Sequence, residues 1–388
     1  MGYSAHIFAI FEPNSSIIRL MVYNWQQRYW PNFTYDLSGL EDAFFLFAEK
    51  TGHIGGILKA LPEAVQMEAI IEIMVAEAIK TSEIEGEYFS RKDVMSSIRN
   101  NLGLNKIKDP VLDKKAAGVS ELMIDVRNTF RDTMTMETLF AWHKMLLGES
   151  AQIKVGEWRN HPEPMQIVSG AIGKEKIHFE APPSERVPAE MEKFIRWFNI
   201  TGPDAEQEIK KTLVRSAIAH LYFESIHPFE DGNGRIGRAI AEKALSQGIG
   251  YPIFLSLSRT IEAYKKDYYN ALEAAQKTNE ITSWITYFVG ATLEAQRLAE
   301  DQIDFVLKKT RFFDRFKNQL NERQLKVISS VLEEGPTGFE GGLNAAKHGS
   351  LTRVSKATAT RDLQDLLEKG ALVLSGPGGR STRYEINL

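Results

Sequence analysis

The segment that most constrains this chain is the polar run His227-Pro228-Phe229-Glu230-Asp231-Gly232-Asn233-Gly234-Arg235-Ile236-Gly237-Arg238. Apolar residues recur at helical spacing before it, over residues 209–226, and again over residues 236–245. Between the two stripes, Pro228 cannot continue a helix because it lacks an N–H group. The two glycines around Asn233 permit backbone conformations closed to other residues. We therefore expect two buried helices joined by a tight polar loop.

The polar residues of this loop are of types that bind polyphosphate and move a proton. The start of the second helix, near residues 231–234, offers free N–H groups and a helix dipole that favours an anion. Arg235 and Arg238 lie three residues apart on one face, and each can grip phosphate oxygens in a bidentate fork. Asp231 suits a hard divalent cation, predicted to be Mg²⁺, that bridges it to phosphate. His227 can accept a proton from a hydroxyl at neutral pH.

This run resembles the signature of the Fic family, His-x-Phe-x-Asp/Glu-Gly-Asn-Gly-Arg-x-x-Arg, at every specified position. The resemblance implies a mainly α-helical Fic-type core, ATP as substrate and Mg²⁺ as cofactor. It also implies transfer of AMP to a Ser, Thr or Tyr hydroxyl of a target protein, with self-modification. The roles implied are those of the base, His227; the metal ligand, Asp231; and the phosphate-binding residues Gly232, Asn233, Gly234, Arg235 and Arg238.

A second match lies upstream, at Thr81-Ser82-Glu83-Ile84-Glu85-Gly86, which resembles the inhibitory motif of the family, Ser/Thr-x-x-x-Glu-Gly/Asn. The preceding segment is rich in helix formers, and Gly86 suits the left-handed position that ends a helix. Thr81 and Glu85 then share a face of that helix. The resemblance implies that Glu85 pairs with Arg238 and occupies the place of the γ-phosphate. The chain is thus similar to the class that carries its inhibitor on the N-terminal side of the same polypeptide.

A third feature is a hairpin predicted from two β-prone runs, residues 166–170 and 176–180, which glycines separate. It follows Gly156-Glu157-Trp158-Arg159, which resembles a family segment found before the flap over the active site. An extended target segment can add to the edge of such a hairpin through main-chain hydrogen bonds. The resemblance assigns nucleotide contacts to Ile177 of the flap and, further along the chain, to Tyr264, Tyr268 and Leu272. By spacing alone, the last three favour a packed helical face.

Residues 321–388 follow a different plan, in which helical segments precede a hairpin around the turn Gly376-Pro377-Gly378-Gly379. This order resembles a winged helix, a variant of the helix-turn-helix. From Asn344 onward, seven basic residues stand against four acidic ones, which leaves DNA binding and protein contacts both open. The residues expected to contact DNA are Lys356, Thr358 and Arg361 on a helix, with Arg380 and Arg383 on the wing.

The rest of the chain is predicted to be helical around this core. Residues 23–33 are aromatic-rich and resemble the N-terminal extension of some bacterial Fic proteins, and we expect them to pack against the core helices. Helical patterns cover residues 40–58, 110–130, 136–147, 188–198 and 281–316. The predicted domains are an N-terminal helical region (1–110) that carries the inhibitory helix, a catalytic core (111–300), a linker helix (301–320) and a winged helix (321–388).

Composition narrows the class of protein. With 388 residues, the chain is too long for one compact core. A net charge of −4 argues against a protein that coats nucleic acid along its whole surface. The absence of cysteine excludes disulfides and thiolate metal sites and fits a reducing, cytoplasmic location. The sequence has no apolar run of the ~20 residues that a membrane span needs, and the resemblance implies a homodimer.

The sequence therefore predicts a Mg²⁺-dependent protein adenylyltransferase that is restrained by Glu85. Two alternatives remain open. One is an enzyme that removes AMP from modified proteins, with Glu85 positioning a water. The other is a nucleotide-sensing transcription regulator in which catalysis is secondary. The target protein and its acceptor residue are not specified by the sequence, and the choice of AMP over another nucleotide rests on the resemblance.

Overall fold

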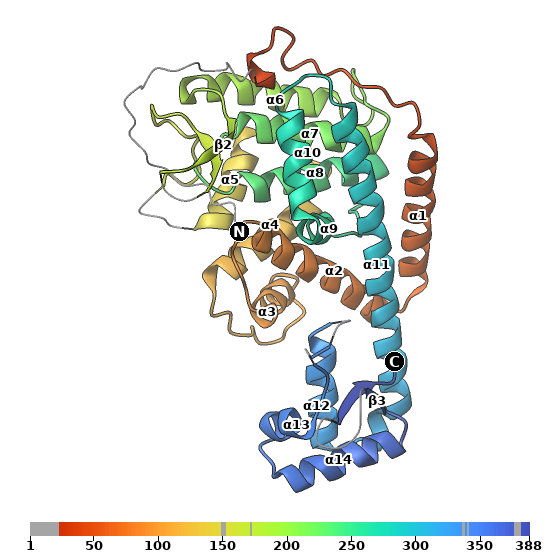
Figure 1. Ribbon diagram of the computed structural model, residues 1–388. Coiled ribbons are helices and arrows are strands. Elements are labelled where there is room, and N and C mark those ends of the chain that lie inside the picture. Colours follow the sequence, from red (N-terminus) through yellow and green to blue (C-terminus); the bar gives the residue numbers. More distant parts are fainter. Residues whose placement is uncertain (1–22, 149–152, 171–172, 336–337, 340, 376–381) are drawn as a thin grey trace. The chain divides into compact units, whose positions relative to one another are not determined.

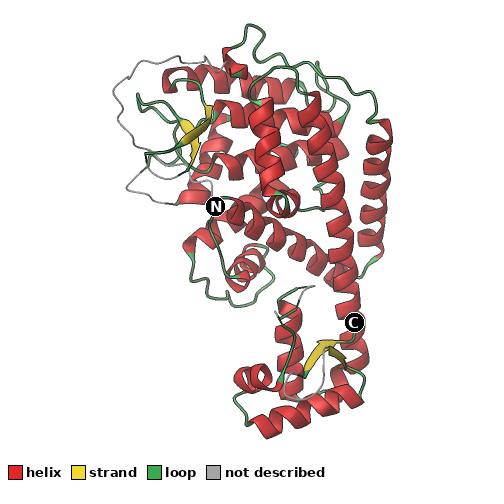
Figure 2. Cartoon of the chain, viewed as in Figure 1, coloured by secondary structure: helices red, strands yellow, loops and turns green. Residues whose placement is uncertain are grey.

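The computed structural model describes residues 23–148, 153–170, 173–335, 338–339, 341–375 and 382–388. Helices dominate these residues, as predicted, and the strands form two antiparallel hairpins (Figures 1 and 2). The chain divides into two compact units. The first unit takes in the chain up to Ile57 and Ile70–Ala299, and the second takes in Leu58–Ala69 and Glu300–Leu388.

The first unit is a helical body with one hairpin. Its elements are η1 (Asn24–Gln26), α1 (Glu41–Ala60), α2 (Glu63–Ile84), α3 (Arg91–Asn101), α4 (Lys114–Asn128), α5 (Met136–Leu147), β1 (Gln166–Ser169), β2 (Lys176–Glu180), η2 (Ser184–Arg186), α6 (Val187–Ile200), α7 (Thr212–Ile226), α8 (Asn233–Ile249), α9 (Leu257–Ala263), α10 (Lys265–Ala275) and α11 (Thr282–Phe316). Helices α1, α2 and α11 each continue into residues of the second unit.

The centre of the first unit is the pair α7 and α8. Every residue of α7 from Leu213 to Ile226 is buried, including the polar side chains of Arg215, His220 and Glu224. The two helices are also joined by a hydrogen bond from the Ser216 hydroxyl to the Ala241 carbonyl, 2.8 Å long. Helix α7 ends at Ile226 and α8 begins at Asn233, so the polar loop between two buried helices is confirmed.

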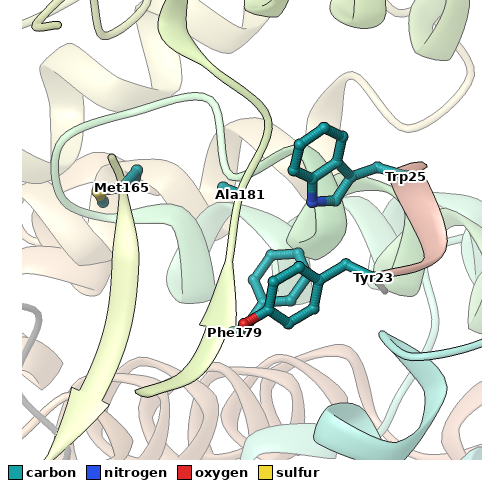
Figure 3. Close-up of a cluster of buried hydrophobic side chains, with 5 residues drawn as sticks. All are labelled: Tyr23, Trp25, Met165, Phe179 and Ala181. Carbon is teal, nitrogen blue, oxygen red and sulfur yellow. The ribbon is translucent and has the colours of Figure 1, made fainter. Parts of the chain in front are cut away.

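The hairpin β1–β2 is also confirmed, and the N-terminal aromatic residues anchor it. The strands are antiparallel, with an irregularity between Ile167 and Val168. Tyr23 meets Phe179 of β2 edge to face, with ring centroids 5.1 Å apart, and Trp25 lies in the same buried cluster (Figure 3). The Trp25 indole N–H donates to the Glu180 carbonyl at 2.7 Å. The aromatic N-terminal segment therefore holds the base of the hairpin in place.

The second unit contains, after the end of α11, the elements η3 (Lys317–Gln319), α12 (Glu322–Glu333), α13 (Ala345–Thr352), α14 (Lys356–Glu368), β3 (Leu372–Ser375) and β4 (Arg383–Ile386). Strands β3 and β4 pair antiparallel, with Leu372 opposite Ile386. Buried apolar side chains of α12 and α14, among them Ile328 and Leu363, form its core. Helices followed by a hairpin are the order predicted from the sequence, although Arg380 lies outside the described residues.

Two features depart from the sequence prediction. Helix α3 was not predicted, because only Val94, Met95 and Ile98 interrupt its polar sequence; its first turn is capped by Ser90, whose hydroxyl accepts from the Asp93 N–H. Tyr264 is not part of a continuous helical face, since it lies at the junction of α9 and α10.

The domain boundary at residue 110 stays a prediction, and Ile70–Ala299 belong to one compact unit across it. Among the described residues, no helix combines the length and apolarity needed to cross a membrane.

Candidate active site

A cavity of about 100 Å³ lies where the end of α7, the start of α8, the hairpin and α10 converge. Its walls combine polar and apolar side chains. They are Glu85, Ile167, His178, Phe179, Glu224, His227, Glu230, Asp231, Gly232, Asn233, Gly234, Arg238, Tyr268, Tyr269, Asn270, Leu272, Glu273 and Gln276. The cavity therefore gathers residues of the polar run, the upstream motif and the hairpin.

His227 is held at the end of α7 by a buried arginine from the segment before the hairpin. The backbone of His227 is left-handed, with φ 50°, which ends the helix and exposes carbonyl groups that need partners. Arg159, only 1% exposed, donates from Nε to the His227 carbonyl at 2.8 Å. Its Nη2 group donates to the carbonyls of Pro182 and Ile226. Burial lowers the pKa of Arg159 to about 10, which still leaves it charged at neutral pH.

The loop after His227 is braced from α5 by a second histidine. The Gly156 N–H donates to Nδ1 of His143 at 2.8 Å, so the ring proton must lie on Nε2, which donates to the Asp231 carbonyl at 3.2 Å. Burial lowers the pKa of His143 to about 4, so the ring is neutral. It stacks on Phe229 with a centroid distance of 4.1 Å. His143 thus fixes the path of the loop beside the cavity.

The loop is closed by Asn233. Its Oδ1 accepts from the Phe229 N–H at 2.9 Å, and its Nδ2 donates to the Phe229 carbonyl at 2.8 Å. Gly232, with φ 82°, supplies the left-handed residue that starts α8. Both polar atoms of the Asn233 side chain are therefore bonded within the loop. Its contribution to anion binding is to fix the loop so that the backbone N–H groups at the start of α8 face the cavity.

Arg238 is held by the upstream motif. Its Nε donates to the Thr81 hydroxyl, and its Nη2 donates to the Thr81 carbonyl and to Oε1 of Glu85, each at 2.8 Å. Burial by itself would lower the pKa of Arg238, but the Glu85 carboxylate outweighs it and raises the pKa above its usual range. A methyl group on Gly234 would lie 2.2 Å from Oε1 of Glu85. The glutamate therefore fills a space that exists because residue 234 has no side chain.

The turn that ends α2 presents two carboxylates. Gly86, with φ 83°, donates to the Glu83 carbonyl, and the Glu87 N–H donates to the Ser82 carbonyl, both at 3.0 Å. This pair of bonds is a Schellman motif with glycine in its left-handed position, as predicted for Gly86. Glu85 and Glu87 flank that glycine. Glu87 pairs with Arg235 of α8 and, at 2.6 Å, with Lys115 of α4.

Asp231 is the candidate metal ligand of the loop. Its side chain is 53% exposed, and its Oδ1 lies 3.5 Å from a terminal nitrogen of Arg235. Among the described residues, no group of three His, Cys, Asp or Glu side chains could hold a metal by itself. Mg²⁺ is commonly bound by one or two carboxylates together with substrate phosphates and waters. Asp231 therefore fits a Mg²⁺ ion that binds together with a polyphosphate.

The apolar walls agree only in part with the nucleotide contacts expected from the sequence. Tyr268 and Leu272 line the cavity and are buried. Ile177 and Tyr264 are 37% and 55% exposed and do not line it. His178 and Phe179, the two residues of β2 that follow Ile177, both line the cavity. Tyr264 lies outside because the break between α9 and α10 turns it away from the face that Tyr268 occupies.

Comparison with known proteins agrees with this geometry. Residues 133–245 match the model of the Fic/DOC family. The chain contains a Fic/DOC family domain. Residues 23–104 match a second model, described as a domain of unknown function, DUF4172. The Fic domain includes the whole polar run, whereas the turn with Glu85 and Glu87 belongs to the second match.

The relatives of this chain are distant. A protein adenylyltransferase Fic of Culex quinquefasciatus is 28% identical over 42% of this chain and 28% of its own length. One of Nematostella vectensis is 24% identical over 50% of this chain and 40% of its own length, so the chain spans less than half of these relatives. A solved Fic-domain-containing signaling protein of Bacteroides thetaiotaomicron is 19% identical, covers 66% of this chain and 95% of its own, and has a TM-score of 0.50. That likeness shows a shared fold.

Several residues of the site were not predicted from the sequence. His178 of the hairpin is hydrogen-bonded through Nδ1 to Glu273 of α10, at 2.7 Å, and through Nε2 to the Ser169 hydroxyl, at 2.6 Å. This contact joins the hairpin to α10 across one side of the cavity. The others are Glu87, which follows the inhibitory pattern by one residue, and His143, Glu224 and Gln276, which stand alone in helical segments without any local pattern.

Proposed function

We propose that this protein transfers AMP from ATP to a hydroxyl side chain of a target protein, and to its own side chains, in a Mg²⁺-dependent reaction that Glu85 restrains. The observation that carries the proposal is the shared cavity. His227, Asp231 and the start of α8 line it together with Arg238, which is held by Glu85. The adenylyltransferase names of the Culex and Nematostella relatives agree with it.

The proposed reaction uses each group for one task. The polyphosphate lies on the amide groups at the start of α8, where the helix dipole favours negative charge, and Arg235 and Arg238 bind its β- and γ-phosphates. Asp231 would hold Mg²⁺, which offsets phosphate charge when it is bound. The acceptor hydroxyl attacks the α-phosphorus while Nε2 of His227 takes its proton. The bond from the α-phosphorus to the bridging oxygen breaks, and pyrophosphate leaves.

Glu85 restrains the reaction because it already occupies Arg238. Three of the five N–H donors of Arg238 are bound to the Glu85 carboxylate and to the two oxygen atoms of Thr81, so fewer remain for a phosphate. ATP bound without that arginine would place its α-phosphate away from His227, and small displacements of reacting atoms can cost on the order of 10²-fold in rate. The adenine ring is proposed to lie against Tyr268 and Leu272, which line the apolar side of the cavity.

The proposal is tested with Glu85→Gly, which should increase labelling of target proteins and of the chain itself by ATP that carries its label on the α-phosphate. Label on the γ-phosphate should not be incorporated. A matched control is Glu83→Gly, which removes a carboxylate from the same helix end. Glu83 pairs with Lys80 and does not line the cavity. A folded Glu85→Gly variant with unchanged or lower labelling would remove the self-inhibition proposal.

A second candidate is removal of AMP from modified proteins. The observation that favours it is the position of Glu85, which lines the same cavity as His227 and is partly exposed. A carboxylate there is placed to orient a water toward a phosphodiester. The two functions predict opposite effects of Glu85→Gly, because release of AMP from a labelled target should stop when the carboxylate is removed and transfer should increase.

For the second unit we propose a winged helix. Three helices and a hairpin support it, as does an isolated bridge between Leu343 and Tyr384 that adds a short third strand. Lys356 and Arg361 are exposed on α14 and Thr358 is half-buried there, where a DNA-reading helix would present them. Arg383, at the turn end of the hairpin, donates to the carbonyl of Gly341, which precedes α13. DNA binding and a homodimer both remain proposals.

A further inference from the structure

Beside His227, in the wall of the same cavity, lies a buried carboxylate to which the proposed reaction gives no role. Glu224 is three residues before His227, at the end of α7, and is 4% exposed. Its Oε2 lies 3.7 Å from Nδ1 of His227. That separation is an ion-pair distance, slightly longer than a hydrogen bond. Catalytic hydrogen bonds are often long without substrate and shorten when it binds.

The surroundings of Glu224 leave the carboxylate directed at His227. Its Oε1 has no hydrogen-bond partner among the described residues. A methyl group on Gly237 would lie 2.3 Å from that oxygen, so α8 accommodates the carboxylate only because residue 237 is glycine. The charged or titratable groups that act on Glu224 are His220 of α7, His227, Arg238 of α8 and Tyr268 of α10.

Burial of a carboxylate oxygen without a hydrogen-bond partner destabilises the folded state. Such a group in the wall of a cavity therefore indicates a functional role. A neutral histidine that accepts a proton on Nε2 must carry its own proton on Nδ1. A carboxylate beside Nδ1 selects that tautomer and stabilises the imidazolium formed when Nε2 takes a proton, as the orienting group of a base does in other hydrolases and transferases. Glu224 stands on the side of His227 that such a group requires.

We propose that Glu224 is the positioning residue of His227, an inference that rests on the proposed adenylyl transfer. Glu224 accepts the Nδ1–H of His227, so the Nε2 lone pair faces the acceptor hydroxyl. The hydroxyl proton then passes to Nε2, the oxygen bonds to the α-phosphorus, and the imidazolium remains paired with Glu224. Pyrophosphate carries away the electron pair of the broken bond. Glu224 itself keeps no proton and does not touch the nucleotide.

The experiment uses the full-length chain in the Glu85→Gly background, where transfer is measurable. Glu224→Gln keeps the shape of the side chain and removes its charge, and Glu224→Leu also removes the acceptor. Both should lower kcat by about 10-fold or more, up to the ~10²–10⁴-fold that loss of a general base costs, with KM for ATP little changed. Glu190→Gln is the control, since Glu190 is another buried carboxylate, hydrogen-bonded to Trp30 and outside the cavity.

A spectroscopic readout separates positioning from a general structural role. In protein labelled with ¹⁵N-histidine, the His227 signal, assigned by its loss in His227→Ala, should report a proton on Nδ1 and move toward the other tautomer in Glu224→Leu. A fall in kcat with an unchanged His227 tautomer, or a tautomer change without a fall in kcat, would overturn the inference. If the parent shows no His227-dependent transfer, the proposed function fails, and the tautomer comparison still tests the Glu224–His227 contact.

Discussion

Gly234 has no side chain, and this decides which group can lie beside Arg238. The Glu85 carboxylate fills the space in the structure, within 2.2 Å of where a methyl group would be. A phosphate oxygen has similar size and charge and would need the same space and the same arginine. One residue position therefore makes the inhibitor and the proposed substrate mutually exclusive.

At the same scale, we expect His227→Ala to abolish AMP transfer and to leave ATP binding largely intact. The imidazole lines the cavity, but its proposed task is to take a proton rather than to hold phosphate, so its loss should reduce the chemical step by ~10²–10⁴-fold. Labelling with α-labelled ATP measures the first effect and calorimetric titration with ATP the second. Undiminished labelling by the alanine variant would disprove the assignment of the base.

The residues predicted for the catalytic loop share one contiguous pattern, whereas Tyr268 and Leu272 were expected from the resemblance alone. His227, Asp231, Arg235 and Arg238 lie in one run, and the structure brings them to one loop and the first turn of α8. His143, Arg159 and Glu224 support that run from other segments. A lone histidine or glutamate in a buried helix has no periodic or local signal, because its partner is set by tertiary packing.

At the scale of elements, the end of α2 acts on both motif arginines. Its capping turn places Glu85 against Arg238 and Glu87 against Arg235. The resemblance predicted the first contact, because the known pattern ends at Gly86, and gave no reason to expect the second. The same geometry explains why the turn needs glycine: only a left-handed residue lets the chain reverse between the two carboxylates.

We therefore expect Glu87→Gln to raise AMP transfer, by less than Glu85→Gly does. It would free Arg235 of one carboxylate, while Asp231, 3.5 Å away, still competes for the same guanidinium. Initial rates of self-labelling at low ATP concentration provide the measurement, with Glu83→Gln as the matched control. Equal rates in Glu87→Gln and the unmodified chain would show that Arg235 is not restrained by this turn.

Where α8 packs on α2 and α4, burial and the nearby carboxylate of Glu77 raise the pKa of Glu242 to about 8. The unfolded chain would ionise this group near its ordinary value of 4.5. Between those values the unfolded state holds fewer protons than the folded state, so stability falls as pH rises, by at most about 1.4 kcal/mol per pH unit.

Glu242 is half-buried, and its replacement by the neutral isostere glutamine should remove this loss of stability. Glu242→Gln should match the unmodified chain in stability near pH 4.5 and exceed it increasingly toward pH 8. Urea unfolding at both values measures the difference, and Glu121→Gln, on the exposed face of α4, is the control. A difference that does not grow with pH would contradict a raised pKa for Glu242.

At the scale of the whole molecule, the chain joins a Fic domain to a unit that we propose to be a winged helix, a fold that often binds DNA. If α14 reads DNA, the double variant Lys356→Ala/Arg361→Ala should weaken binding to DNA from upstream of its own gene and leave AMP transfer unchanged. Each cationic side chain removed from a phosphate should flatten the slope of log affinity against log salt by about 0.9, so the double variant should flatten it by about 1.8. Lys92→Ala/Lys106→Ala, two exposed lysines of the first unit, removes the same charge. If the double variant at Lys356 and Arg361 leaves the salt dependence of DNA affinity unchanged, we would assign this unit to protein contacts instead.

Glu85, the proposed inhibitory residue, follows Ile84, the last helical residue of α2. Release of Glu85 therefore requires only that the capping turn fray, while the hydrogen bonds inside the helix stay intact. Helix ends open locally at a free-energy cost far below that of global unfolding. Under the proposed self-inhibition, a small fraction of molecules would be open at any moment, and ATP would bind to that fraction. Any partner that loosens or tightens this one turn would thereby set the basal activity of the protein.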